Sequence, residues 1–479
     1  MQPVHTPHPH AATRRRLAAA ALVLASGAAS ADSVTDWNLV SGQVQPAYGA
    51  PPSRAYLGAM VQLAVHDALN SISPRFESYN TIPLASPSAN PDAAVAAAAH
   101  DVLIHELSRA PDNPGKIAAR ALVETAYANA LGAIPDGASE NQGVATGQAA
   151  AAAMIARRLN DGSATRDLPY TLAPGVGVYQ PTPPAFAPPQ FAGFALMPTF
   201  VLNSPSQYRA DPSEILDVTS DAYARDYNEV KTLGNAVTRA AAPDSEESRI
   251  ARFFPGGGAD WEAVARTIVP GLGLDRWEHA RLFALIDVSS ADGAMTFYDT
   301  KYTYNFWRPV TAIRWADDGN PATESDATWS SYIATPPYPD YTCGLPTIAG
   351  ASTEAMRRFF GTDEVPYTLT AAGVTRHYDR LSQAAQEAAD ARVYGGIHFR
   401  TGCEMGVKIG EKVGRFVSLH ALRPLKHKNK NDTVLKPNAP APAPVVVERV
   451  AVEAPARVAA PSRAADGSRP TPTRRGIAP

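Results

Sequence analysis

The amino-acid sequence predicts an all-α protein made of two packed helical bundles, with an extended, proline-rich strap between the two halves. Apolar residues recur at helical spacing through most of 53–159 and again through most of 214–419. Strand-like alternation of apolar and polar residues is scarce along the whole chain. Prolines cluster between the two helical regions, where they disfavour both helix interiors and central strands. These observations together favour the all-α class.

The first helical region opens with SRAYLGAMVQLAVHDALNSIS at 53–73. The apolar side chains of this stretch fall three and four residues apart, and Ser53 is suited to cap the N-terminus of the helix. Alanine-rich stretches that follow suit close packing of helices. These further helices are expected at 92–108, 116–131 and 141–159.

A proline-rich segment at 169–213 interrupts the helical pattern. It also carries many aromatic residues, so a solvated linker is a poor interpretation, and we expect an ordered strap that lies over the helices. Helical spacing then resumes for the second bundle. The helices expected there are 214–235, 245–253, 258–269, 274–300, 346–360 and 379–419.

The two ends of the chain differ in composition from the middle. Residues 1–31 hold a basic segment, an apolar run of Leu17–Ala29 and an Ala-Ser-Ala cleavage site, which predict a signal peptide cut before Asp32. The protein is therefore expected to be exported, to a periplasm or as a secreted protein. Residues 426–479 are rich in proline and alanine, basic and free of aromatic residues, which predicts a disordered tail. The folded domain is expected to span 32–425.

Charge and hydropathy exclude some classes of partner. The formal net charge of −3 gives no reason to expect a nucleic-acid partner. No stretch after the signal reaches the ~18–20 consecutive apolar residues of a membrane span. The chain has two cysteines, Cys343 and Cys403, and an exported protein can keep a disulfide.

The segment KYTYNFWRP at 301–309 holds the first candidate for chemistry. Lys301 and Arg308 are seven residues apart, close to two helical turns, so both would lie on one face of a helix. Two cations without nearby acids suit a multiply charged anion. The aromatic residues between them argue for burial, while a solvated helix face is the alternative.

The stretch DYTCGLPTIAGA at 340–351 is the second candidate. A turn of small residues that opens a helix offers free N–H groups to an anion, and Gly344 lies at that point. Asp340 and Cys343 are the residues here that could release a proton. The alternative is a plain turn that leads into a helix.

The third candidate is RVYGGIHFR at 392–400. Arg392 precedes His398 by six residues, and the two glycines between them indicate close approach of a backbone or ligand, because glycine costs a helix ~1 kcal/mol relative to alanine. His398 could be a nucleophile or a metal ligand. A buried histidine with only structural partners is the alternative.

These three segments, in this order, resemble the signature of the vanadium-dependent haloperoxidase and type-2 phosphatidic acid phosphatase superfamily. The signature reads Lys, six residues, Arg-Pro; then Pro-Ser-Gly-His; then Arg, five residues, His, three residues, Asp. Other stretches are similar to the exported bacterial haloperoxidase-like branch, and the resemblance covers about residues 32–422. These stretches are VTDWN at 34–38, YQPTPPAF at 179–186, DYNEVKTLG at 226–234, YNFWRPVTAIR at 304–314 and YGGIHFR at 394–400.

The resemblance implies a fold of the haloperoxidase type and an oxyanion pocket. Lys301, Arg308 and Arg392 would neutralise the oxygens of vanadate or phosphate, and Gly344 would donate a backbone N–H. His398 would be bonded to vanadium in a haloperoxidase, or would be the phosphorylated nucleophile in a phosphatase.

The sequence departs from the signature at two positions. Leu345 replaces the general acid–base histidine, and loss of such an acid typically costs ~10²–10⁴ in rate. The final aspartate, which orients the metal-binding histidine, falls on Gly402. Glu404 is a possible substitute. Asp292 and Asp299 are candidate partners of the pocket arginines, with a surface role as the alternative.

The resemblance also implies that Cys343 and Cys403 meet, because the second and third motifs converge on one pocket in the superfamily. We therefore expect a Cys343–Cys403 disulfide, with two free thiols as the alternative.

Three functions remain open. The first is a vanadate-dependent enzyme that oxidises halide with hydrogen peroxide, at reduced activity because Leu345 replaces the general-acid histidine. The second is a phosphatase that acts on phosphoesters through phospho-His398, and the third is an oxyanion-binding protein that has lost catalysis. The haloperoxidase-like enzyme ranks first. The sequence does not indicate the oligomeric state.

Overall fold

The computed structural model describes residues 32–425. The all-α prediction is confirmed for these residues, which form helices and a single short hairpin of β1 (Tyr367–Ala371) and β2 (Val374–Tyr378). The signal peptide expected at 1–31 and the tail expected at 426–479 lie outside the described residues. None of the described helices is both long enough and apolar enough to cross a membrane.

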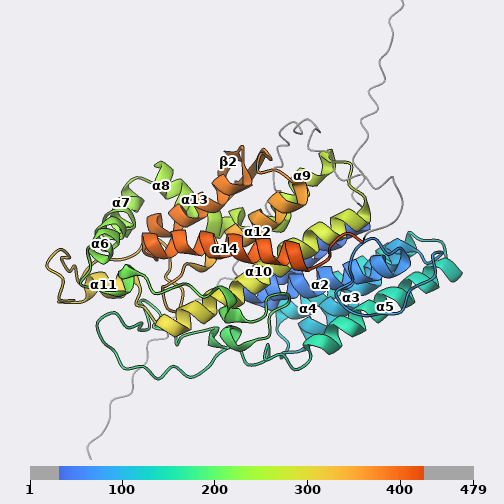
Figure 1. Cartoon of the computed structure of the whole chain (residues 1–479), viewed down its shortest axis with the longest axis horizontal. Coiled ribbons are helices and arrows are strands. Elements are labelled where there is room, and N and C mark those ends of the chain that lie inside the picture. The colour runs from blue at the N-terminus through green and yellow to red at the C-terminus, as the bar shows by residue number, and fades with distance from the viewer. Residues whose placement is uncertain (1–31, 426–479) are drawn as a thin grey trace, which may run out of the picture.

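The first bundle consists of five helices at one end of the molecule (Figure 1). Proline occupies the first turn of α2, α3 and α4, where its missing N–H costs nothing. The first helix was not predicted, and its N-terminus is capped by Asp32, which accepts a hydrogen bond from the backbone of Thr35. The five are α1 (Ser33–Tyr48), α2 (Pro51–Ile72), α3 (Pro91–Ser108), α4 (Pro114–Gly132) and α5 (Ala138–Arg158).

The strap expected at 169–213 is present. It contains two short 3₁₀ turns, η1 (Ala192–Leu196) and η2 (Pro205–Tyr208), and a third, η3 (Glu214–Leu216), follows it. Buried Asp292 anchors it, because the carboxylate accepts the N–H groups of three successive strap residues. The donors are Phe200, Val201 and Leu202, at 2.6, 2.8 and 2.9 Å.

The second bundle contains the longest helix among residues 32–425, α10 (Arg276–Tyr304), which has 29 residues. This helix packs against α2 of the first bundle and α12 of the second, so it joins the two halves (Figure 1). The π-turn η4 (Phe254–Gly258) and the 3₁₀ turn η5 (Val269–Gly271) flank α9. The helices are α6 (Asp221–Leu233), α7 (Ala236–Ala241), α8 (Glu246–Phe253), α9 (Trp261–Ile268), α10 (Arg276–Tyr304), α11 (Pro309–Arg314), α12 (Gly344–Phe360), α13 (Leu381–Tyr394) and α14 (Arg400–His420).

Helices α12 and α14 pack side by side in parallel, through a row of glycines on α14. At three of these glycines, an added methyl group would lie under 3 Å from a backbone oxygen of α12 or of the residue just before it. The N-termini of both helices therefore meet at one end, where two of the three candidate segments lie. The pairs are Gly406 with Cys343 (2.7 Å), Gly410 with Thr347 (2.1 Å) and Gly414 with Ala351 (2.3 Å).

Replacing Gly410 with alanine is expected to destabilise the fold by about 1–3 kcal/mol, because its new methyl group would force the two helices apart. Gly42→Ala is the matched control. Gly42 lies in α1 with no atom within 4 Å of an added methyl group. The control should stabilise the helix by ~0.5–1 kcal/mol. Urea unfolding of both variants checks this, and a Gly410→Ala protein as stable as the parent would contradict the close packing.

Candidate active site

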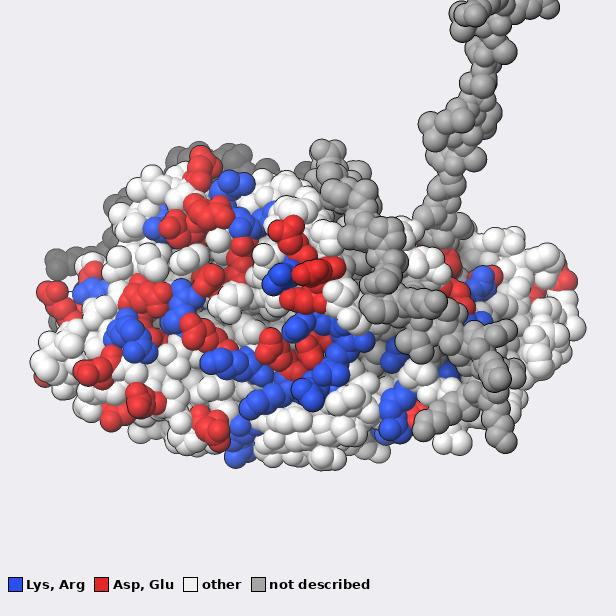
Figure 2. All heavy atoms as spheres, turned by 45° about the horizontal axis from the view of Figure 1, so that its top comes forward, with Lys and Arg blue, Asp and Glu red and all other residues white. Residues whose placement is uncertain are grey.

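Three buried cations converge on one site from different elements. Lys301 belongs to the last turn of α10, Arg308 directly precedes α11, and Arg392 belongs to the last turn of α13. Their exposed fractions are 0%, 0% and 8%. Basic and acidic side chains are mixed over the face shown in Figure 2, with basic ones gathered in a band across its middle. The three buried cations therefore differ from the charges of the protein surface.

Lys301 and Arg308 do not share a helix face, and that prediction is wrong. Helix α10 ends at Tyr304, because Asn305 adopts the left-handed conformation with a φ of 52°. Pro309 then starts α11. The expected burial is confirmed, since the Tyr338 ring covers both cations, at 5.3 Å from Lys301 Nζ and 4.9 Å from Arg308 Cζ.

His398 lies in the turn between α13 and α14 and is 2% exposed. The two glycines before it allow the close approach that the sequence indicated. Gly396 has a φ of +76°, and a methyl group there would lie 2.2 Å from the backbone oxygen of Gly234. This contact, with the C-terminal end of α6, holds the turn that presents His398.

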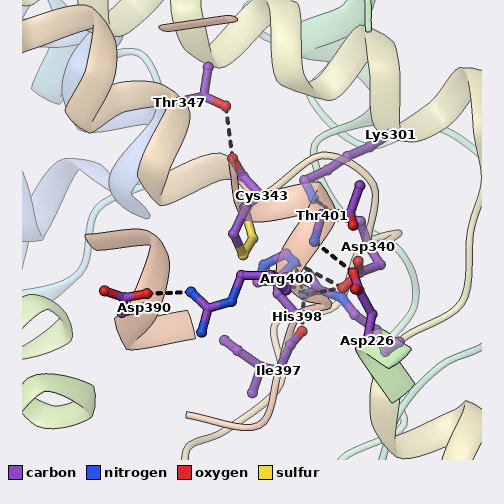
Figure 3. Close-up of a disulfide and its surroundings, with 12 residues drawn as sticks. Asp226, Lys301, Asp340, Cys343, Thr347, Asp390, Ile397, His398, Arg400 and Thr401 are labelled. Carbon is purple, nitrogen blue, oxygen red and sulfur yellow. Dashed lines mark hydrogen bonds and ion pairs between the residues drawn. A yellow bond between two sulfur atoms is a disulfide. The ribbon is translucent and has the colours of Figure 1, made fainter. Parts of the chain in front are cut away.

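His398 lies between the carboxylate of Asp340, which Figure 3 labels beside it, and the guanidinium of Arg308. Its Nδ1 is 2.9 Å from Asp340 Oδ1, and its Nε2 is 2.9 Å from Arg308 Nη1. Arg308 Nη1 also donates to the backbone oxygen of Ile397 at 2.8 Å. The Asp340 carboxylate beside Nδ1 and the Arg308 donor at Nε2 favour the neutral imidazole that carries its proton on Nδ1 and a lone pair on Nε2.

Asp340 occupies the place of the missing orienting aspartate. A methyl group at Gly402 would lie 3.7 Å from Asp340 Oδ2, so the carboxylate reaches the space next to that position from another segment. Glu404 is exposed, so the suggestion that it substitutes for the aspartate is wrong. Lys301 Nζ donates to the backbone oxygens of Pro339 and Asp340, at 2.9 and 2.6 Å, which fixes this segment.

Burial dominates the electrostatics of the site. It raises the pKa of Asp340 to about 7, although Arg308 and Lys301 oppose this shift. Burial and the three cations hold the pKa of His398 well below its usual range, so its imidazole is neutral. Burial also lowers the pKa of Lys301, with a further contribution from Arg308, and lowers that of Arg392 to about 10.

The site has more positive charge than its carboxylate balances. Among residues 32–425, the single carboxylate within ion-pair distance of the three cations is Asp340, 3.7 Å from Arg308 Nη1. Arg308 Nη2 and Arg392 Nε are buried and have no hydrogen-bond partner in this part of the chain. Unpaired buried donors are costly, so these residues fit an oxyanion, which would accept their hydrogen bonds and offset their charge.

The turn at the start of α12 contributes backbone groups. Gly344 is the first residue of this 17-residue helix, and the first N–H groups of a helix have no partner within it. Leu345 is half-buried and packs against the core, so the proton donor of the signature has no counterpart at this position. The structure thus brings the five predicted residues into one region around His398: Lys301, Arg308, Gly344, Arg392 and His398 itself.

The predicted disulfide between Cys343 and Cys403 is confirmed, and Figure 3 shows it beside His398. The two sulfur atoms and a ring nitrogen of His398 all lie within 4.8 Å of one another. Both cysteines are fully buried.

Two carboxylates expected near the pocket arginines serve other roles. Asp292 anchors the strap, and Asp299 pairs with Arg209 at 2.7 Å. The sequence did not indicate that Asp226 accepts a hydrogen bond from the backbone of Thr401 at 2.7 Å, which ties α6 to the first turn of α14. The pairing of Asp340 with His398 was also missed, because the two residues are distant in the chain.

Known proteins are similar to this chain in sequence and in fold. Residues 281–427 match the family model of the VCPO second helical-bundle domain. The vanadium chloroperoxidase of Curvularia inaequalis is 27% identical over a match that covers 26% of this chain and 28% of that enzyme. The chain thus spans less than a third of that relative's length.

Two solved bacterial structures share the fold. A vanadium-dependent iodoperoxidase superposes with a TM-score of 0.69 at 24% identity, over 83% of this chain and 97% of that one. A holo-type vanadium-dependent chloroperoxidase gives a TM-score of 0.60 at 21% identity, over 77% and 91%. The matched second bundle and the shared fold show that this chain is built like the vanadium-dependent haloperoxidases, and they support the superfamily that its sequence motifs resemble.

Proposed function

We propose that this protein is a haloperoxidase-like enzyme that binds vanadate and oxidises halide with hydrogen peroxide. The observation that carries the proposal is the buried cluster of Lys301, Arg308 and Arg392 around a neutral His398, with unpaired guanidinium nitrogens. The vanadium chloroperoxidase and iodoperoxidase relatives support vanadate as the oxyanion. Vanadate, when bound, supplies Lewis-acid activation of peroxide.

Each residue has a distinct part in this proposal. Arg308 and Arg392 donate hydrogen bonds to the oxygens of the oxyanion, and Lys301 adds charge while holding the Asp340 segment. Gly344 donates a backbone N–H. His398 offers its Nε2 lone pair once Arg308 Nη1 turns to the oxyanion. Asp340 keeps the proton of His398 on Nδ1.

The position of Leu345 limits the chemistry, because no acid stands next to Gly344 to move a proton. We therefore propose an activity lower than that of a protein with the complete signature, by ~10²–10⁴. We also propose that the protein acts after export, as the signal-like sequence of 1–31 indicates.

A phosphatase reaction is the second candidate, and one observation favours it. The neutral imidazole and the lone pair on Nε2 are what a nucleophilic histidine needs, and phosphate resembles vanadate in charge and shape. An oxyanion-binding protein without catalysis is the third candidate, favoured by Leu345.

One set of assays separates the three candidates. Protein purified without phosphate is tested for vanadate binding, for bromide oxidation with hydrogen peroxide, and for aryl-phosphate hydrolysis. Halide oxidation that depends on added vanadate is the expected result. Hydrolysis inhibited by vanadate would favour the phosphatase, and binding without either activity would favour the third candidate.

The pKa of Asp340, raised to about 7, predicts that affinity for the oxyanion falls as the pH rises from 6 to 8. Below pH 7 the protonated carboxyl leaves the site more positive, whereas above pH 7 the carboxylate repels the bound anion. Asp340→Asn should show a smaller fall, and the difference between the two proteins removes the effect of vanadate's own ionisation. Vanadate titrations at both pH values measure this. An equal fall in affinity in the parent protein and in Asp340→Asn would contradict this role of Asp340.

A further inference from the structure

We propose that Cys343 and Cys403 are a redox-active pair, and that the reduced protein consumes small hydroperoxides by a dithiol reaction that needs no bound vanadate. The inference is independent of the proposed haloperoxidase function. It rests on where the two cysteines lie, on His398 beside them, and on the unpaired donors of Arg308 and Arg392, whose charges act on His398.

Both cysteines lie in the first turn of a helix. Cys343 is the N-cap of α12 without a side-chain cap hydrogen bond, and Cys403 is the fourth residue of α14. Because the two helices are parallel, their positive ends face the same disulfide. The partial positive charge of two helix N-termini is therefore directed at the same pair of sulfur atoms.

The groups near this disulfide are polar and cationic, which a disulfide that only stabilises the fold does not require. His398 has a ring nitrogen within 4.8 Å of both sulfur atoms, and Arg308 contacts His398. Arg308 Nη2 and Arg392 Nε lack an acceptor, and both residues are more than nine-tenths buried. In this proposal they stabilise the oxygen that leaves a hydroperoxide.

The reaction runs in two balanced steps from the dithiol. The Cys343 thiolate attacks one peroxide oxygen, so an S–O bond forms, the O–O bond breaks, and the departing oxygen takes the former thiol proton and leaves as water or alcohol. Cys403 then attacks Cys343 Sγ, which forms the disulfide and expels the sulfenic oxygen with the second thiol proton as water. Sulfur loses two electrons and the peroxide gains them.

A dithiol reductant completes the cycle. It supplies two electrons and two protons to the disulfide and becomes a disulfide itself. Full burial of both cysteines restricts the oxidant to a small hydroperoxide and the reductant to a small dithiol.

The test uses the full chain, freed of vanadate by a chelator, reduced with dithiothreitol and desalted. One equivalent of hydrogen peroxide should remove two thiols and one peroxide per chain and restore the disulfide. The rate should exceed that of free cysteine at the same pH by about tenfold or more, since preorganised donors of this kind contribute ~10²–10³ elsewhere. Cys403→Ser should stop at a sulfenic acid on Cys343 that dimedone traps.

Two variants test whether the buried cations, and not the thiols alone, speed the peroxide reaction. Arg392→Met should slow the peroxide reaction, whereas Arg400→Met, whose side chain pairs with Glu229 and Asp390, should not. A reduced protein that reacts no faster than free cysteine, or a disulfide that is reduced only after unfolding, would overturn the proposal.

Discussion

Replacing Arg392 with methionine is expected to lower vanadate affinity by roughly 100-fold or more, while the folded protein becomes more stable. Arg392 has no carboxylate partner among residues 32–425, and burial lowers its pKa to about 10. Its charge therefore costs free energy in the folded state. Removing an uncompensated buried charge should stabilise the fold, on the order of 1–3 kcal/mol. Losing a buried charged donor to the anion should cost at least ~3 kcal/mol of binding.

Arg400→Met is the matched control for these two opposite effects, the loss of vanadate affinity and the gain in stability. Arg400 lies eight residues further along the chain and pairs with Glu229 at 2.8 Å and with Asp390. This variant should lose stability and keep its vanadate affinity. Thermal unfolding and vanadate titration of both variants provide the measurement. If Arg392→Met were both destabilised and unchanged in affinity, Arg392 would be a structural residue.

Replacing Leu345 with histidine is expected to raise halide oxidation by ~10²–10⁴. Leu345 is the second residue of α12, next to Gly344, so a histidine there would add an acid–base group beside the proposed oxyanion. Because Leu345 is half-buried, a polar ring has access to solvent on one side and should be tolerated.

Leu345→Phe controls for the size of the new ring, because it adds similar volume without a proton. Bromide oxidation should increase in the histidine variant alone, when both variants are saturated with vanadate. A histidine variant that binds vanadate and is no more active than the phenylalanine variant would show that a missing acid does not limit this protein.

The fold was largely predictable because helical spacing persists over long segments. Buried α2 follows its expected range, and proline content located the strap. The single helix expected at 379–419 is wrong, because the chain turns after Tyr394 and forms two helices, α13 and α14. The first helix, α1, was missed because Pro46 lies inside it and its pattern of buried residues includes polar Asn38 and Ser41. The hairpin was missed because two five-residue strands leave little periodicity to detect.

The candidate site was predictable only where its residues keep a fixed spacing in the chain. Lys301, Arg308, Arg392 and His398 follow from motif spacing. Asp340 could not be assigned, because its role depends on the chain approaching the position of Gly402 in space. That approach is set by the packing of α12 on α14, which a single sequence does not encode as a local pattern.

The central claim is that His398 is the group that bonds a tetrahedral oxyanion within the cationic site. Titration of phosphate-free protein with vanadate, followed by isothermal calorimetry, tests it most directly. The account predicts one vanadate per chain and an affinity that falls at least ~100-fold in His398→Ala. His377→Ala, a change in the exposed hairpin, should leave the affinity unchanged. Equal vanadate affinity in His398→Ala and the parent protein would contradict the claim.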